Sequence, residues 1–224
     1  MAANASYDAL LRDTSVALTA AGIDNVRFEA RLLLSRAAGL TIEQLISRGP
    51  DPAPAPVAAV LRELTARRVR REPMAYILGE REFWGLPFQV SPAVLIPRPD
   101  SETVIETVLA LLPDRGRKLR ILDLGLGSGC LLLTLLREYP AATGVGIDAS
   151  EAALTVARAN AEALGVAPRA HLLAADWRQD GWMAALEGPF DLLVSNPPYI
   201  ESAAVDGLMP EVSAHEPRLA LDGG

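Results

Sequence analysis

The 224-residue sequence predicts an α/β protein in which a doubly wound domain with a mostly parallel, twisted sheet follows a small all-α domain. Two observations predict this fold class. From Arg120 onward, apolar strand-like runs alternate with amphipathic helical runs, the order that produces right-handed βαβ units. Before Pro73, apolar residues recur only at the spacing of a helix. We therefore expect a helical domain over residues 1–73, a β-hairpin linker over 74–92 and an α/β domain over 93–224.

The N-terminal part is expected to be helical. Apolar residues fall on one helical stripe over residues 7–18 and on a second over 26–37. Thr41 and Gln44 form a capping-box pattern for a short third helix. The DPAPAP run at 51–56 forbids regular helix and is expected to be a stiff connector before a fourth helix.

A basic run, RRVRR at 67–71, lies in the fourth helix. A solvated helix face is the favoured interpretation, and contact with nucleic acid or an acidic partner is the alternative. The chain as a whole has a net charge of −7, and residues 76–224 hold 11 Lys and Arg against 20 Asp and Glu. Because nucleic-acid binders usually present a basic face, we expect no direct nucleic-acid substrate.

From Tyr76 the residue types change. The segment YILGEREFWGLPFQV is rich in aromatic and β-branched residues and is broken by glycines, which predicts a short hairpin. Asp100 or Ser101 can cap a helix that runs through about Leu112. The alternation that follows predicts strands at RILDL, TGVGID, HLLAAD and FDLLVS, and helices at CLLLTLLREY, SEAALTVARANAEALG and WMAALE. These helices are expected to cover both faces of the sheet.

Composition excludes several classes of protein. Half of the residues are apolar and 22% are charged, which is typical of a globular chain. No stretch approaches the ~18 uncharged apolar residues of a membrane-spanning helix, and no signal peptide is evident. The single cysteine, Cys130, cannot form an internal disulfide, and with His171 and His215 it makes no zinc pattern. We therefore expect a cytoplasmic protein that uses no metal and no membrane.

A glycine-rich turn lies between the first strand of the α/β domain and the helix after it. Its residues are Asp123, Gly125, Leu126, Gly127, Ser128 and Gly129. Glycines let the backbone approach a ligand closely, and the following helix presents free N–H groups. The next strand ends in Asp148, whose carboxylate can accept both ribose hydroxyls of a nucleoside. Together these features favour a nucleoside cofactor over a plain tight turn.

The details of the turn indicate which cofactor is bound. A dinucleotide fingerprint needs Gly or Ala at position 130, where this chain has Cys130. S-adenosylmethionine carries a sulfonium and an ammonium, so the carboxylate of Asp123 is favourable near it. At the third strand end, Asp176 can accept from an adenine amino group and Trp177 offers a flat face to the ring. A capped loop with a core tryptophan explains these last two residues equally well.

The most specific segment is Asn196-Pro197-Pro198-Tyr199, directly after the strand FDLLVS. Two successive prolines hold the backbone rigid at the carboxyl edge of the sheet, where open α/β sheets bind their ligands. The Asn196 side-chain carbonyl and the Pro197 main-chain carbonyl can each accept one N–H of a planar –NH₂ group, on which Tyr199 can stack. This arrangement predicts catalysis at the nitrogen of an amide or an exocyclic amine, although an Asn-Pro-Pro turn is also a plain structural possibility.

The set YILG, FWG, PRPDSE, DLGLGSG, GID, ADW, SNPPYI and HEPRLALDGG resembles the PrmC/HemK family of protein N5-glutamine methyltransferases, and the resemblance covers nearly the whole chain. NPPY alone also occurs in enzymes that methylate DNA adenine or ribosomal RNA guanine, but the flanking LIPRPDSE and EPRLAL are more restrictive. The resemblance implies a Rossmann-like class I methyltransferase fold and S-adenosylmethionine as methyl donor, with S-adenosylhomocysteine as product. The implied acceptor is the glutamine of the GGQ motif in class 1 peptide chain release factors.

The resemblance also assigns residues to roles. Gly125 to Gly129, Asp148 and Trp177 fall on cofactor positions, and Asn196 to Tyr199 on positions that bind the substrate amide. Leu126 stands where a small polar residue is more usual, but its backbone can still serve. We therefore expect Asn196, Pro197 and Tyr199 to be catalytic, and from the residue chemistry above we expect Asp123, Asp176 and Asn196 near the cofactor. Members of the family normally continue beyond the EPRLALDGG region, so we expect a truncated form that lacks the usual last strands.

Release factors are the expected partner, held by the helical domain, and the chain is expected to be a monomer. The nearest alternative is an amino-methyltransferase acting on adenine N6 or guanine N2 of DNA or RNA, which would have to flip a base from its stack. A NAD-dependent oxidoreductase is disfavoured by Cys130. A binding module that holds the cofactor without turnover is the remaining alternative.

Overall fold

A computed structural model describes residues 5–224, with the side chain of Ala185 left out. The chain folds as two compact units, one ending at Leu78 and the other spanning Gly79–Gly224. Within the described residues, no helix has both the length and the apolar character needed to cross a membrane.

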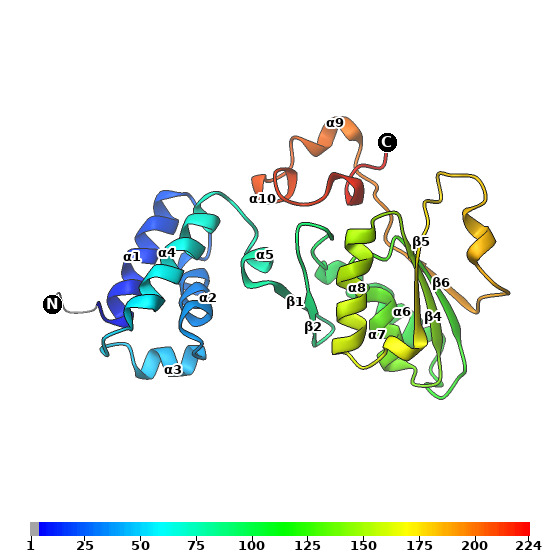
Figure 1. Cartoon of the computed structure of the whole chain (residues 1–224), viewed down its shortest axis with the longest axis horizontal. Coiled ribbons are helices and arrows are strands. Elements are labelled where there is room, and N and C mark those ends of the chain that lie inside the picture. The colour runs from blue at the N-terminus through cyan, green and yellow to red at the C-terminus, as the bar shows by residue number, and fades with distance from the viewer. Residues whose placement is uncertain (1–4) are drawn as a thin grey trace. The chain divides into compact units, whose positions relative to one another are not determined.

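The first unit is built from helices (Figure 1). They are α1 (Tyr7–Ala20), α2 (Val26–Ala38), α3 (Ile42–Ser47), α4 (Ala55–Val69) and α5 (Met74–Leu78). Ser6 caps α1 and Thr41 caps α3, the latter with the reciprocal Gln44 bond that the sequence predicts. The helices α1, α2 and α4 pack on one another around Leu18, Leu33 and Leu34, which are almost completely buried.

The basic run at 67–71 is not a simple solvated face. Arg68 is only 6% exposed, and its Nε donates to Glu29 on α2 at 2.7 Å. Arg67 forms a second ion pair, with its Nε donating to Glu72 at 2.8 Å. Because both guanidiniums are engaged inside the unit, these two arginines stabilise the helix packing and are poorly placed to bind nucleic acid.

The second unit opens with the expected hairpin, in which β1 (Glu80–Phe83) pairs antiparallel with β2 (Leu86–Gln89). Trp84 and Gly85 both have positive φ, the backbone of a two-residue primed turn. The expectation that the hairpin segment is extended from its start was wrong for residues 74–78, which form α5. There the N–H groups of Tyr76 and Ile77 donate to the Pro73 carbonyl, and both side chains are buried.

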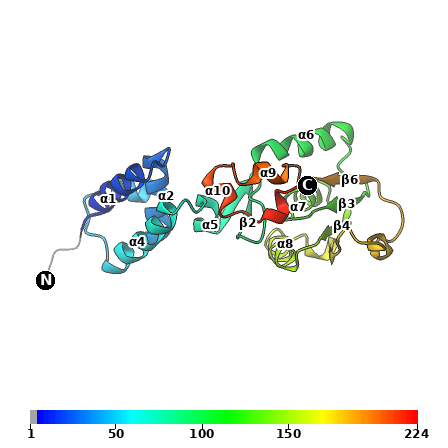
Figure 2. The ribbon, with the colours of Figure 1, turned by 90° about the horizontal axis from the view of Figure 1, so that it is seen from above.

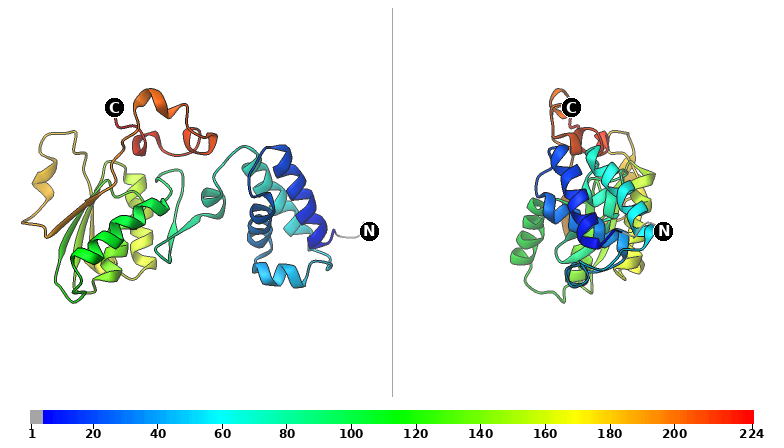
Figure 3. Two further views of the ribbon diagram at one scale, coloured as in Figure 1. Left: turned by 180° about the vertical axis from the view of Figure 1, so that it is seen from behind. Right: turned by 90° about the vertical axis from the view of Figure 1, so that its left-hand side faces the viewer.

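A four-stranded parallel sheet forms the centre of the second unit. Its strands are β3 (Arg120–Leu124), β4 (Thr143–Asp148), β5 (Ala170–Ala174) and β6 (Leu192–Ser195), in the spatial order β5-β4-β3-β6. Three helices, α6 (Glu102–Leu111), α7 (Cys130–Glu138) and α8 (Glu151–Ala163), lie together on one face of the sheet (Figures 2 and 3). The parallel order of the strands agrees with the expected fold class, and it brings all their carboxyl ends to one edge.

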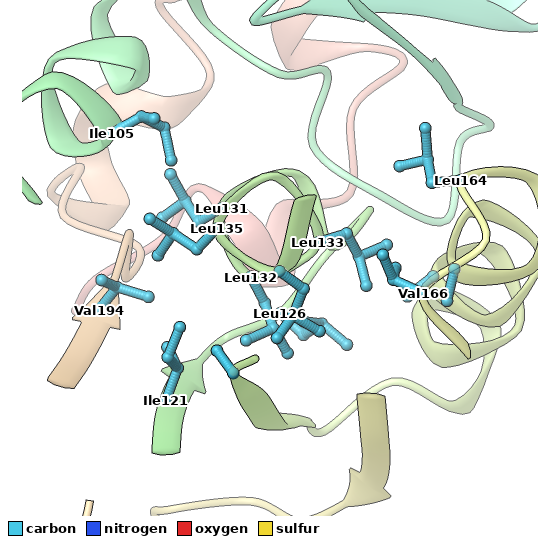
Figure 4. Close-up of a cluster of buried hydrophobic side chains, with 14 of the residues drawn as sticks. Ile105, Ile121, Leu126, Leu131, Leu132, Leu133, Leu135, Leu164, Val166 and Val194 are labelled. Carbon is cyan, nitrogen blue, oxygen red and sulfur yellow. The ribbon is translucent and has the colours of Figure 1, made fainter. Parts of the chain in front are cut away.

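The expectation that helices cover both faces of the sheet was wrong for the described residues, since α6, α7 and α8 all lie on one face (Figure 3). Figure 4 shows the larger core, in which α7 presents leucines all round its surface and fills the layer between the sheet and its neighbours. The opposite face carries Leu122, Val145 and Ile147, packed against apolar side chains from residues 173–190. That segment holds only a 3-10 turn, Trp182–Ala185, at the position where the sequence predicts a short helix.

After β6 the chain forms two short helices and returns to the carboxyl edge of the sheet. These helices are α9 (Ser202–Val205) and α10 (Pro210–Ser213), followed by a 3-10 turn at Arg218–Ala220. Ile200 donates to the Leu221 carbonyl at 3.0 Å, and Gly223 donates to the Ile200 carbonyl at 2.8 Å. The last residues therefore lie beside the segment that follows β6, above the ends of the strands (Figure 1).

Candidate active site

The glycine-rich turn sits at the carboxyl end of β3, and its three glycines all have positive φ. The N–H groups of Gly125 and Leu126 donate to the Ile147 carbonyl, which fixes the turn to the neighbouring strand β4. A Cβ on Gly129 would lie 2.8 Å from Leu133, so this residue is needed for close packing of α7 on the turn. The Leu126 side chain points into the core, which leaves only its backbone available to a ligand.

Asp148 lies at the end of β4 and is held by two backbone groups. Its Oδ2 accepts from the Gly127 N–H at 2.8 Å, and its Oδ1 accepts from the Ser150 N–H at 2.9 Å. A carboxylate oxygen has a second lone pair, so both oxygens can still accept from a ligand hydroxyl. The carboxylate is thus oriented in advance next to the glycine-rich turn.

Asp123 is the least solvated carboxyl of the site, with 1% of its surface exposed. Its Oδ2 accepts a 3.3 Å hydrogen bond from the Leu132 N–H, while its Oδ1 has no partner among the described residues. Burial raises the pKa of this carboxyl to about 7, and the nearby charge of Asp148 adds to the rise. A buried, unpartnered oxygen in a cavity wall suits a ligand that supplies a positive charge or a donor.

Asp176 and Trp177 follow β5, and both line the cavity described below. The Asp176 carboxylate is bound by Arg178, whose Nε and Nη2 donate to it at 2.9 and 2.8 Å, and this lowers the pKa of Asp176 to about 2. The Trp177 ring lies over the turn, since a Cβ on Gly125 would be 3.1 Å from its Cη2. Trp177 is therefore both a core residue and a ring face beside the turn.

The Asn-Pro-Pro-Tyr segment follows β6, which the Ser195 hydroxyl ties to the Leu124 carbonyl at 2.7 Å. Asn196 lines the cavity, and its side chain hydrogen-bonds to no described residue. Pro197 and Pro198 also line the cavity, so two acceptors, the Asn196 amide oxygen and the Pro197 carbonyl, come from adjacent residues. Tyr199 does not line it and is 79% exposed, so its ring is open to a partner.

One cavity of about 570 Å³ joins these groups at the carboxyl edge of the sheet. It includes every predicted site residue except Gly129 and Tyr199. Two further walls come from residues 92–98, after the hairpin, and from residues 217–223, near the end of the chain. A cavity of this volume accommodates a nucleoside-sized ligand together with a small acceptor group.

Asn160 is a buried residue of the site region that sequence reasoning missed. Its Oδ1 accepts from the Gln89 N–H at 2.7 Å, and its Nδ2 donates to the carbonyls of Gln89 and Ser128 at 3.0 and 2.9 Å. The side chain thereby connects the hairpin to the glycine-rich turn. Its only signal in the sequence is an amide on the otherwise apolar face of α8.

The cavity contains a thiol but no cluster of metal ligands within residues 5–224. Burial raises the pKa of the Cys130 thiol to about 12, so it stays protonated at neutral pH and is a poor nucleophile.

Two family models match the chain. The PrmC N-terminal domain matches residues 9–79, and the methyltransferase small domain matches residues 101–215. The release factor glutamine methyltransferase of Bradyrhizobium diazoefficiens is 45% identical over 98% of this chain and 73% of its own length. That of Caulobacter vibrioides is 47% identical over 91% of this chain and 69% of its own length.

Among solved structures, the catalytic domain of human METTL16, determined with the MAT2A 3′UTR hairpin 6, has a TM-score of 0.50. It is 18% identical in sequence, and the match covers 72% of this chain and 58% of that one. At this identity the likeness shows the fold alone.

Proposed function

The chain belongs to the release factor glutamine methyltransferase family, whose members depend on S-adenosylmethionine, and we propose that its cavity methylates the side-chain amide nitrogen of the GGQ glutamine in class 1 release factors. One observation carries the proposal. The two amide acceptors of Asn196 and Pro197 share a cavity with the unpartnered carboxyl oxygen of Asp123. A site that can accept both N–H groups of an –NH₂ thus lies in the same cavity as a site that can bind a cation.

The residues present fit S-adenosylmethionine. Asp148 is oriented to accept from ribose hydroxyls, and Asp123 offers a free oxygen to positive charge. The ring of Trp177 provides an apolar face for adenine, while the backbone of the glycine-rich turn permits close approach. Asp176 can contribute only through lone pairs that Arg178 leaves open.

When bound, S-adenosylmethionine supplies an electrophilic methyl group on its sulfonium. An amide nitrogen is a weak nucleophile, because its lone pair is delocalised into the carbonyl. Asn196 and Pro197 are suited to accept one N–H each, which fixes the nitrogen and holds its lone pair toward the methyl-donor side of the cavity. In well-aligned systems such orientation supplies up to about 7–11 kcal/mol of a barrier.

The same two hydrogen-bond acceptors also stabilise the positively charged nitrogen that methyl transfer forms. As the nitrogen gains its new bond it becomes positive, so its N–H groups become stronger donors to Asn196 and Pro197. Once the methyl group has left S-adenosylhomocysteine behind, the nitrogen can release its excess proton to water, and no strong base is required. The exposed side chain of Tyr199 is suited to cover the substrate amide when a release factor docks. The helical unit that ends at Leu78 is the proposed holder of that partner.

Mass spectrometry tests the proposal directly. A release factor is incubated with this chain and S-adenosylmethionine, and the peptide that carries GGQ is analysed. We expect one added methyl group on the glutamine. Methylation of an adenine or guanine amino group in DNA or RNA supplied in parallel, with the glutamine unmodified, would instead assign the chain to nucleic acid.

A further inference from the structure

An ion pair between a buried carboxylate, Glu216, and a partly exposed arginine, Arg98, lies outside the catalytic groups. The Glu216 side chain is 1% exposed, and its Oε1 accepts from Arg98 Nη2 at 2.6 Å. Its Oε2 accepts from the Ile96 N–H at 3.2 Å. These contacts join two segments that carry the family resemblance, LIPRPDSE and HEPRLALDGG, which are more than a hundred positions apart.

Each partner belongs to a wall of the cavity. Arg98 lines the cavity together with Val94, Leu95 and Pro97, on the wall that follows the hairpin. Glu216 does not line it, but the residues directly after Glu216, from Pro217 to Gly223, contribute another wall. The ion pair therefore connects the 92–98 wall to the start of the 217–223 wall.

The wall that Glu216 anchors also supports the Asn-Pro-Pro-Tyr segment. Ile200, the next residue after Tyr199, exchanges two backbone hydrogen bonds with Leu221 and Gly223. Gly223 is in close contact as well, since an added Cβ would lie 2.8 Å from the Pro198 carbonyl oxygen and 2.9 Å from the Tyr199 Cα. A shift of the 217–223 wall would therefore be transmitted to the acceptor site.

The buried charge makes this anchor specific. A carboxylate that is removed from water is strongly disfavoured unless charged and N–H partners compensate it. Arg98 and the Ile96 N–H are the two partners that the structure gives Glu216. Moving the 217–223 wall away from the 92–98 wall would leave that buried carboxylate without its partners. The pair therefore favours one arrangement of the two walls.

We propose that the Arg98–Glu216 ion pair is a positioning device for the acceptor side of the cavity, which holds the backbone of Pro198–Ile200 so that Asn196 and Pro197 are aligned for the substrate amide. This inference rests on the proposed function. Both members of the pair are positioning residues and neither is assigned a catalytic role.

The test uses two single variants, one double variant and a matched control. Glu216→Gln keeps an oxygen for the Ile96 N–H but removes the charge that Arg98 compensates. Gly223→Ala leaves the pair intact and displaces the same backbone directly. Gly207→Ala is the control, because its Cβ would make only an ordinary 3.5 Å contact with the Ala204 carbonyl.

Three quantities are measured on the full chain: the Kd for S-adenosylhomocysteine, the kcat/KM for methylation of a release factor, and the amide hydrogen exchange of the Ile200 and Gly223 N–H groups. For Glu216→Gln and Gly223→Ala we expect faster exchange and a kcat/KM lower by about 10²-fold, the effect of a misplacement of about 1 Å. The Kd should stay at the wild-type value, and Gly207→Ala should match wild type throughout. Arg98→Met added to Glu216→Gln should cause no further loss.

Other results would overturn the inference. Wild-type kcat/KM and exchange in Glu216→Gln would show that the pair positions nothing. A parallel loss of S-adenosylhomocysteine binding would place its effect on the cofactor side, and a further loss on adding Arg98→Met would show that Arg98 contacts the acceptor itself. If the wild-type chain methylates no release factor, the proposed function fails, whereas the exchange of Ile200 and Gly223 still decides whether the pair holds this backbone.

Discussion

Replacing Gly129 by alanine tests the packing of the glycine-rich turn on α7. Gly129 has a φ of +82°, and a Cβ there would lie 2.8 Å from Leu133 Cδ1 and 3.0 Å from its Cγ. A non-glycine residue in this backbone region costs about 1–3 kcal/mol. Leu133 is fully buried, so it cannot swing away, and overpacking of a core adds about 1–3 kcal/mol. We therefore expect Gly129→Ala to lower the free energy of unfolding by about 2–6 kcal/mol.

Gly127→Ala is the matched control, because Gly127 also has a positive φ but a Cβ there would meet no atom within 4 Å. It should show only the backbone cost of about 1–3 kcal/mol. Urea unfolding is followed by tryptophan fluorescence, since all three tryptophans, Trp84, Trp177 and Trp182, lie in the second unit. Equal destabilisation of the two variants, measured without ligand, would refute the steric argument.

Four other predictions concern the carboxylates of the cavity and the buried amide of Asn160. Because the pKa of Asp123 is raised in the folded protein, the folded state loses stability as this carboxyl ionises. In urea titrations, the free energy of unfolding of the wild type should therefore fall relative to that of Asp123→Asn as the pH rises from about 4 to about 7. In calorimetry, the wild type should bind S-adenosylmethionine more weakly below about pH 7, because binding must then release the proton from Asp123. The affinity of Asp123→Asn should not show this pH dependence. Asp148→Ala should raise the Kd for S-adenosylhomocysteine, because it removes the proposed acceptor of the ribose hydroxyls and the bond to the Gly127 N–H. An unchanged Kd would exclude that role. Asn160→Asp can accept from Gln89 but cannot donate to the Ser128 carbonyl, so we expect weaker cofactor binding and a lower unfolding midpoint, and no change in either would contradict its bridging role.

The α/β architecture could be predicted because its signals are local. Each strand is a short apolar run, and parallel strands joined by helices must place their carboxyl ends at one edge. This topology alone brings Asp123, Asp148 and Asn196 into one cavity, although they are far apart in the sequence. The turn glycines were recognisable because only glycine readily adopts their positive φ.

The contacts that hold the cavity walls together could not be predicted. Asn160 and Glu216 form hydrogen bonds to groups in distant segments, and no sequence pattern around either residue indicates which group is its partner. Arg178 was missed in the same way, although it occupies much of the Asp176 carboxylate. The helix at 74–78 was missed because its residue types favour strands. Its first turn forms because the Pro73 carbonyl accepts hydrogen bonds from the N–H groups of Tyr76 and Ile77.

In the proposed mechanism, Asn196 orients the substrate amide and has little part in holding the cofactor. Asn196→Ala separates the two roles when the Kd for S-adenosylhomocysteine and the single-turnover rate of release-factor methylation are measured on the same preparation. We expect the rate of methyl transfer to fall steeply while the Kd stays close to that of wild type. A large loss of cofactor affinity, or methyl transfer at the wild-type rate, would contradict the division of roles on which the mechanism rests.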